Sequence, residues 1–220
     1  MIIDKNCRKL KEILPTSEHL KYWLIKWFRI KKHYPLVATE VLCDYKWQAD
    51  ILTSDYKKII EVEVKVSLSD LKNDFIKKAG KYESLSGKVF GEKRGYVNND
   101  KLLIPNYFYF AMPEKILNKA YKIVKDTPYG LLCIHSGHYN DDDYITIIKE
   151  SNKLNNIYPE KLEKLIIKRM SSEILGLRGK ILELKNEFEN KKDLKSFDFY
   201  NWLKENDLER YNILFRQKIS

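Results

Sequence analysis

The sequence has little cysteine and no long apolar segment. Its three cysteines, Cys7, Cys43 and Cys133, are far apart and form no C-x-x-C motif. Scattered thiols are typical of reduced cysteines in the cytosol, and they argue against a disulfide framework or a thiolate metal site. No apolar run approaches the roughly 18 residues of a transmembrane helix, and residues 1–15 lack the apolar region of a signal peptide. We therefore expect a soluble, cytoplasmic protein without a membrane partner.

Basic residues, by contrast, are abundant. The 220 residues include 41 Lys and Arg against 31 Asp and Glu, which gives a formal net charge of +10 at pH 7. Such a surplus favours a polyanionic partner, nucleic acid first, through attraction to phosphates. Apolar residues make up 44% of the chain and aromatic residues 13%, which allows a substantial core and argues against disorder.

Hydrophobic periodicity predicts an α/β core that is followed by a helical extension. The composition shifts after Asn155, so we place the core in residues 1–155 and the extension in 156–220. Thr16 or Ser17 is expected to cap the first helix, and Ser67 or Ser69 the helix that runs through Tyr82. In order, the predicted elements are a helix to about residue 33, strands 36–43, 47–54 and 59–66, the helix through 82, strand 106–113, helix 114–125, strands 129–136 and 144–150, and helices 159–190 and 197–217.

Two further segments have a distinct character. Residues 84–101 lose periodicity and contain three glycines, which predicts a basic loop. Residues 159–190 carry apolar side chains at steps of three and four. This apolar stripe favours packing against another protein segment over binding to DNA. Two alternatives remain for this helix: it packs against the rest of the same chain, or it forms the interface of a homodimer.

The strand at 59–66 alternates branched apolar side chains with ionisable ones. This period of two places Glu61, Glu63 and Lys65 on one face of a sheet. A short turn joins it to the preceding strand, and the hairpin is expected to bring Asp50 beside Glu63, since cross-strand Cβ atoms lie about 5 Å apart. A solvent-exposed strand face or a structural salt bridge between Glu63 and Lys65 is the plainer alternative.

Two close carboxylates repel each other, and a hard divalent cation such as Mg²⁺ relieves the repulsion. Lys65 reaches the same side as Asp50 and Glu63, where it could orient or deprotonate an attacking water or offset transition-state charge. Glu61 is expected to be a solvated edge residue or an auxiliary group. Glu40, in an earlier strand, is a candidate third carboxylate.

Asp50 followed by Glu63-Val64-Lys65 resembles the PD-(D/E)xK nuclease superfamily, with "QAD" where a proline usually precedes the first acid. The stretches "QADIL", "VEVKVSLSDLKNDF", "NYFYFAMPEKI" and "YGLLCI" follow the order and spacing of its MmcB-like branch, which is linked to DNA repair. The resemblance spans residues 39–134. It departs at Gln48, where arginine is usual, and at the loop 84–101, which looks like an insertion.

The resemblance implies a restriction-endonuclease-like core, a central four-stranded mixed sheet flanked by helices. It also implies a Mg²⁺-dependent endonuclease that cleaves DNA with a metal-activated water, and Mn²⁺ is a plausible substitute. The implied catalytic residues are Asp50, Glu63 and Lys65, and the implied metal residues are Asp50, Glu63, Val64 and Glu40. Expected contacts to nucleic acid are Ser67, Lys77, Lys81, Lys88, Lys93 and Arg94.

Other interpretations stay open at this point. Ser67 and Asp70 also fit helix caps, and Lys81 also fits a solvated surface lysine. A non-catalytic module that binds nucleic acid or a protein partner would carry the same charge and fold. An RNA-directed nuclease shares every residue argument, because nothing in the sequence indicates a contact to the 2′-hydroxyl.

Overall fold

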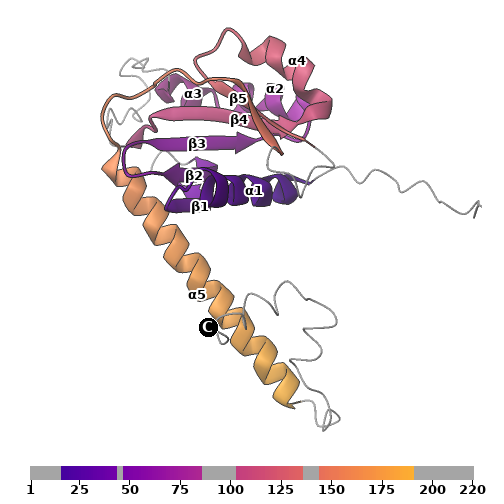
Figure 1. Cartoon of the computed structure of the whole chain (residues 1–220), viewed down its shortest axis with the longest axis vertical. Coiled ribbons are helices and arrows are strands. Elements are labelled where there is room, and N and C mark those ends of the chain that lie inside the picture. Colours follow the sequence, from indigo (N-terminus) through magenta and orange to yellow (C-terminus); the bar gives the residue numbers. More distant parts are fainter. Residues whose placement is uncertain (1–15, 44–46, 86–102, 136–143, 191–220) are drawn as a thin grey trace, which may run out of the picture. The chain divides into compact units, whose positions relative to one another are not determined.

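The computed structural model describes residues 16–43, 47–85, 103–135 and 144–190 (Figure 1). The expected C-terminal helix at 197–217 and the loop residues Lys88, Lys93 and Arg94 lie outside these ranges. The elements are α1 (Ser17–Lys26), the π-helix η1 (Trp27–Lys31), β1 (Leu36–Leu42), β2 (Gln48–Ser54), β3 (Ile59–Val64), α2 (Leu68–Lys77), α3 (Ala79–Leu85), β4 (Tyr107–Pro113), α4 (Glu114–Val124), β5 (Gly130–Ile134), β6 (Ile145–Lys149) and α5 (Glu160–Asn190).

The strands form one mixed sheet in the order β1-β2-β3-β4-β5-β6. β1, β2 and β3 are antiparallel neighbours, β3, β4 and β5 run parallel, and β6 returns antiparallel at the edge. The α/β class and the mixed sheet are confirmed, and the six strands that periodicity predicted are present, two more than the four-stranded core that the resemblance implies. β5 and β6 extend the sheet, because the wholly buried β5 needs a partner on each side.

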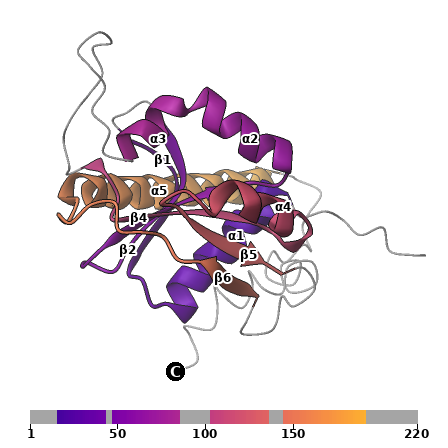
Figure 2. The same cartoon turned by 90° about the horizontal axis from the view of Figure 1, so that it is seen from above.

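Helices cover both faces of the sheet (Figure 2). On one face, Leu20 and Leu24 of α1 pack with Ile51 and Val62 of the sheet. On the other face, a core of aliphatic and aromatic side chains joins α2, α3 and α4 to β4 and β5. The rings of Tyr82, Phe108, Phe110 and Tyr129 contact one another there.

β3 lies in the middle of the sheet, and each of its residues is buried. The alternation is as predicted, but the ionisable face is covered by α2 and α3. Glu61, expected at a solvated edge, is only 4% exposed. That expectation was wrong, because an alternating pattern tells which residues share a face and not whether a helix covers that face.

The predicted helix after β3 is divided into two. Ser67 caps α2 as expected, since its hydroxyl accepts the N–H of Asp70 at 3.1 Å. α2 ends at Lys77. The backbone of the C-cap residue, Lys78, leaves the helical region at φ −110° and ψ 29°, and α3 begins at Ala79. Asp74 on α2 is buried, and so is Lys81 on α3.

α5 confirms the long helix that the apolar stripe predicted. The chain divides into two compact units, Met1–Met170 and Ser171–Ser220. This division is later than residue 155 because the first turns of α5, with Leu162 and Ile166 fully buried, belong to the core of the first unit. None of the helices in the described ranges has the length and apolar character needed to cross a membrane.

The contact between β4 and β5 can be tested at Gly130. A Cβ at this position would lie 2.3 Å from two ring carbons of Tyr109, its partner on β4, and 2.9 Å from the Ser151 nitrogen. We expect Gly130→Ala to destabilise the fold by about 1–3 kcal/mol, as overpacking does, in urea unfolding followed by circular dichroism.

Gly176→Ala is the matched control, because a Cβ there meets nothing within 4 Å. Inside the α5 helix this change should stabilise by up to about 1 kcal/mol. An unfolding midpoint for Gly130→Ala equal to that of the parent would contradict the packing of β4 on β5.

Candidate active site

The hairpin brings Asp50 opposite Glu63. Ile51 pairs with Val62, and the same register, continued by one residue, sets Asp50 against Glu63. The Oδ2 atom of Asp50 accepts the backbone N–H of Val64 at 2.7 Å. The carboxylate therefore takes the place of a strand carbonyl where β2 and β3 separate, and its side chain stays 22% exposed.

Lys21 of α1 completes the Asp50 side of the site. Its Nζ atom contacts Glu40 and lies 3.6 Å from Oδ1 of Asp50 and 3.2 Å from Glu18. The Lys21 side chain is only 9% exposed, and these carboxylates raise its pKa against the effect of burial. Lys21 could not be identified from the sequence, because the residue follows Leu20 on an amphipathic helix and looks like a surface lysine.

Glu40 has an unusual backbone for a strand residue. Its φ is +52°, and it falls between the pairs Thr39–Ile51 and Val41–Ala49, which places it opposite Asp50. The left-handed region costs a non-glycine residue about 1–2 kcal/mol. Strain of this kind is concentrated at functional sites. The structure thus brings Glu40 and Asp50 to one lysine, and the role of Glu40 as a third carboxylate stays a prediction.

Glu63 is enclosed by three lysines. Its side chain is 1% exposed. The Oε1 atom lies 3.3 Å from the ammonium of Lys65 and also contacts Lys78, while Oε2 accepts from Lys81 at 2.9 Å. An isolated buried carboxylate would be strongly unfavourable, so these ion pairs are what allow Glu63 to be charged inside the sheet.

Asp74 of α2 is a second buried carboxylate in this group. Its Oδ1 atom lies 2.8 Å from Lys65 and 3.1 Å from Lys78, and its Oδ2 accepts from the hydroxyl of Tyr82. Lys65 is therefore held between Glu63 and Asp74. In the sequence, Asp74 lies within the stretch "VEVKVSLSDLKNDF" that carries the family resemblance.

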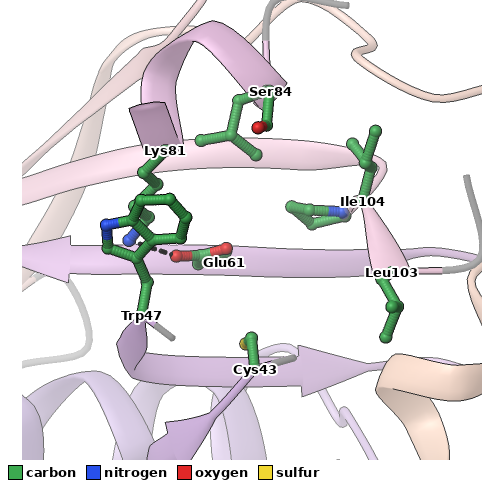
Figure 3. A pocket seen from close by; sticks show the side chains of 9 residues that line it. Cys43, Trp47, Glu61, Lys81, Ser84, Leu103 and Ile104 are labelled. Atoms are coloured by element: carbon green, nitrogen blue, oxygen red, sulfur yellow. Dashed lines mark ion pairs between the residues drawn. The ribbon is translucent and has the colours of Figure 1, made fainter. Parts of the chain in front are cut away.

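The Glu61–Lys81 pair forms the far side of the group (Figure 3). The two side chains lie 2.6 Å apart and are about equally buried. The Lys81 ammonium also lies 5.2 Å from the ring centre of Phe108. Beside the pair, Trp47 and Cys43 line a cavity of about 20 Å³, room for about one water molecule. Lys81 is thus a buried ion-pair residue, neither the solvated lysine nor the surface phosphate contact that we expected.

Asp50 and Glu63 have pKa values that are pushed apart. Burial and the charge of Glu63 raise the pKa of Asp50 to about 6. Burial also disfavours the ionised form of Glu63, but the lysines around it, Lys81 foremost, outweigh burial and lower the pKa of Glu63 to about 2. Near neutral pH both groups are ionised, and Asp50 is the one that takes up a proton first.

The remaining expected residues are placed as follows. Ser67 is the N-cap of α2 and also contacts the hydroxyl of Ser69 at 3.0 Å. Lys77 is exposed near the end of α2. The side chain of Val64 has no atom that could bind a metal ion, and the backbone N–H of Val64 donates to the carboxylate of Asp50. In the described part of the chain, no three His, Cys, Asp or Glu side chains gather into a group that could hold a metal ion.

Comparison with known proteins adds little to this site. The chain matches no protein-family model and no curated protein. Among solved structures it is similar to the SPO1766 protein of unknown function from Silicibacter pomeroyi. The TM-score is 0.48 at 15% identity, over 83% of this chain and 99% of that chain. The family resemblance in the sequence therefore stays a prediction.

The ion-pair group predicts a large effect of Lys81→Met. The substitution leaves Glu61 and part of Glu63 buried without their cation, and removing one partner of a buried pair costs about 3–5 kcal/mol. We expect a marked fall in thermal midpoint, measured by circular dichroism at pH 7.

Lys77→Met is the control, because Lys77 is exposed and should tolerate the change. The double variant Glu61→Gln, Lys81→Met should regain part of the lost stability, since one of the uncompensated charges is gone. Equal losses for Lys77→Met and Lys81→Met would contradict the buried pair.

Proposed function

We propose that this chain is a Mg²⁺-dependent nuclease that hydrolyses phosphodiester bonds in DNA. The observation that carries the proposal is the meeting of Asp50, Glu63 and Lys65 where β2 and β3 separate. Neighbouring carboxylates whose pKa values are pushed apart are a feature of catalytic sites. A restriction-endonuclease-like core is part of this proposal. The observed order of elements is compatible with such a core: a helix, three antiparallel strands, the helices α2 and α3, and then β4, which runs parallel to β3.

The donor set is suitable for a hard divalent cation. Mg²⁺ takes one or two carboxylates and keeps several waters, so it needs no cage of three protein ligands. Asp50 and Glu63 would hold it, with Val64 and Glu40 adjacent. A cation already sits at this oxygen set: the Lys78 ammonium contacts Oε1 of Glu63, and the Lys78 side chain is 30% exposed. Bound Mg²⁺ would lower the pKa of a water and polarise the phosphate.

The protein side chains would do the remaining work. Lys65, fixed between Glu63 and Asp74, presents a positive charge that stabilises the charge developing on the phosphate. Asp50, the most exposed of these three carboxylates, gives the water access to the site. Lys21 holds Glu40 and Asp50 in place through its ion pairs.

Nucleic acid fits the charge of the chain. The net charge of +10 and exposed lysines such as Lys77 support salt-dependent phosphate binding. We prefer DNA to RNA because of the resemblance to DNA-repair proteins, and we place the protein in the cytoplasm. A homodimer through α5 stays a prediction.

One observation favours a second function, a nucleic-acid-binding module without catalysis. Both carboxylate oxygens of Glu63 are already bound by lysines. In that case the ion pairs would be purely structural, and the protein would bind nucleic acid without cutting it.

Cleavage of supercoiled plasmid and labelled oligonucleotides, DNA and RNA, with Mg²⁺, Mn²⁺ or EDTA distinguishes the two functions. We expect metal-dependent DNA cleavage that falls by on the order of 10²-fold or more in Asp50→Asn and in Lys65→Met, as loss of a catalytic electrostatic group predicts. The matched controls are Asp126→Asn, whose side chain is 84% exposed, and Lys72→Met on the exposed face of α2. Binding without cleavage under every metal would favour the module.

Lys78 should compete with the metal for Glu63. We expect Lys78→Met to bind Mn²⁺ on the order of tenfold more tightly than the parent, because one fewer positive charge lies beside the carboxylate oxygens. Isothermal titration calorimetry and the electron paramagnetic resonance signal of free Mn²⁺ measure this. Lys78→Arg retains the charge and should bind as the parent does, and Lys77→Met controls for surface charge. Unchanged Mn²⁺ affinity in Lys78→Met would refute this role of Lys78.

A further inference from the structure

A second cavity lies on the α1 face of the sheet, opposite to the face that carries Glu61 and Glu63. It encloses about 200 Å³, and its walls come from η1, β3, β4, β5 and β6. About 10–15 Å³ of such space is enough to hold one water molecule. The space therefore suits a ring-sized ligand, whereas the cavity beside Trp47 and Lys81 holds about 20 Å³.

One wall of this cavity is aromatic. Trp27 and Phe28 lie side by side with ring centres 4.9 Å apart, and Tyr34 contacts Phe28 at 5.4 Å. Trp27 and Phe28 belong to the π-helix η1, a conformation that is rare and frequently found at functional sites. These rings offer stacking surface to a planar ligand.

Charged groups line part of the cavity, beside apolar residues of the sheet. The ammonium of Lys32 lies 4.8 Å from the Trp27 ring centre, and that of Lys58 lies 5.8 Å from the ring centre of Tyr107. Glu150 accepts a hydrogen bond from the hydroxyl of Tyr109 at 2.7 Å. Two lysines against one carboxylate leave a positive balance, which suits a ligand with an anionic group.

Tyr34 brings a hydrogen-bond donor to the cavity. The residue lines the cavity and is only 8% exposed. Its hydroxyl is not one of the buried side-chain atoms of the described residues that lack a hydrogen-bond partner, so it is accessible from the cavity. Burial raises the pKa of Tyr34, so the hydroxyl stays protonated and can donate.

We propose that this cavity binds a nucleotide, with the base against the Trp27 wall and the phosphate at Lys58 and Lys32. The Tyr34 hydroxyl donates to an acceptor on the base. The shared chemistry is a planar heteroaromatic ring joined to a phosphate, whether the nucleotide is free or part of a strand. The inference does not depend on the nuclease proposal, because the cavity shares no residue with Asp50, Glu63 or Lys65.

The test is isothermal titration calorimetry of the full chain with the four nucleoside monophosphates, adenosine, ribose 5-phosphate and a ten-nucleotide single strand. We expect at least one monophosphate to bind at least tenfold more tightly than adenosine or ribose 5-phosphate, since each of these lacks half of the recognised chemistry. Lys58→Met should weaken that binding about tenfold by removing a charge-assisted contact. Tyr34→Phe, which removes only the hydroxyl, should weaken it several-fold.

Lys57→Met is the matched control, because the exposed Lys57 precedes Lys58 and should leave the affinity unchanged. Asp50→Asn should also leave it unchanged, which separates this site from the candidate active site. If the strand binds more tightly than the monophosphates and depends on Lys58 and Tyr34, the pocket serves a nucleic acid; otherwise it serves a free nucleotide. Absence of monophosphate binding, or binding that both Lys58→Met and Tyr34→Phe leave intact, overturns the proposal.

Discussion

The balance of charge around Glu63 is the constraint on which the surrounding structure depends. A carboxylate at the centre of a six-stranded sheet is tolerated only when cations reach it, because burying an unpaired ion costs several kcal/mol. Lys65 directly follows β3, Lys78 lies at the break between α2 and α3, and Lys81 lies on α3. The covering helices are thus held to the sheet by ion pairs as well as by the core of aliphatic and aromatic side chains.

The two faces of the sheet carry different chemistry. Central parallel strands are buried on both sides, so a polar side chain on them must be paired. On the α2 and α3 face the pairing is ionic, and Asp50 at the separating strand ends gives the group contact with solvent. On the α1 face the core is apolar and aromatic, and it leaves a cavity whose lining includes Lys32, Lys58 and Glu150. The candidate active site and the proposed nucleotide pocket follow from this division.

Much of the local structure could be predicted from the sequence. Alternation identified β3 and the shared face of Glu61 and Glu63, hydroxyl residues marked the helix starts, and the apolar stripe identified α5. The candidate site was predicted less completely. Lys21 and Lys81 look like surface lysines on amphipathic helices, and their ion pairs join elements far apart in the chain. The positive φ of Glu40 could not be predicted from the sequence, because glutamate is not one of the residue types that favour this conformation.

By itself, the sequence determined which residues share a face and where most elements begin, because these depend on local periodicity and capping. It also determined the hairpin that sets Asp50 against Glu63, since a short turn leaves little choice of register. Only the tertiary structure decided that the ionisable face of β3 is buried, that Lys65, Lys78 and Lys81 neutralise it, and that β5 and β6 extend the sheet. The physical reason is that burial and ion pairing depend on contacts between segments distant in the chain, which no local pattern encodes.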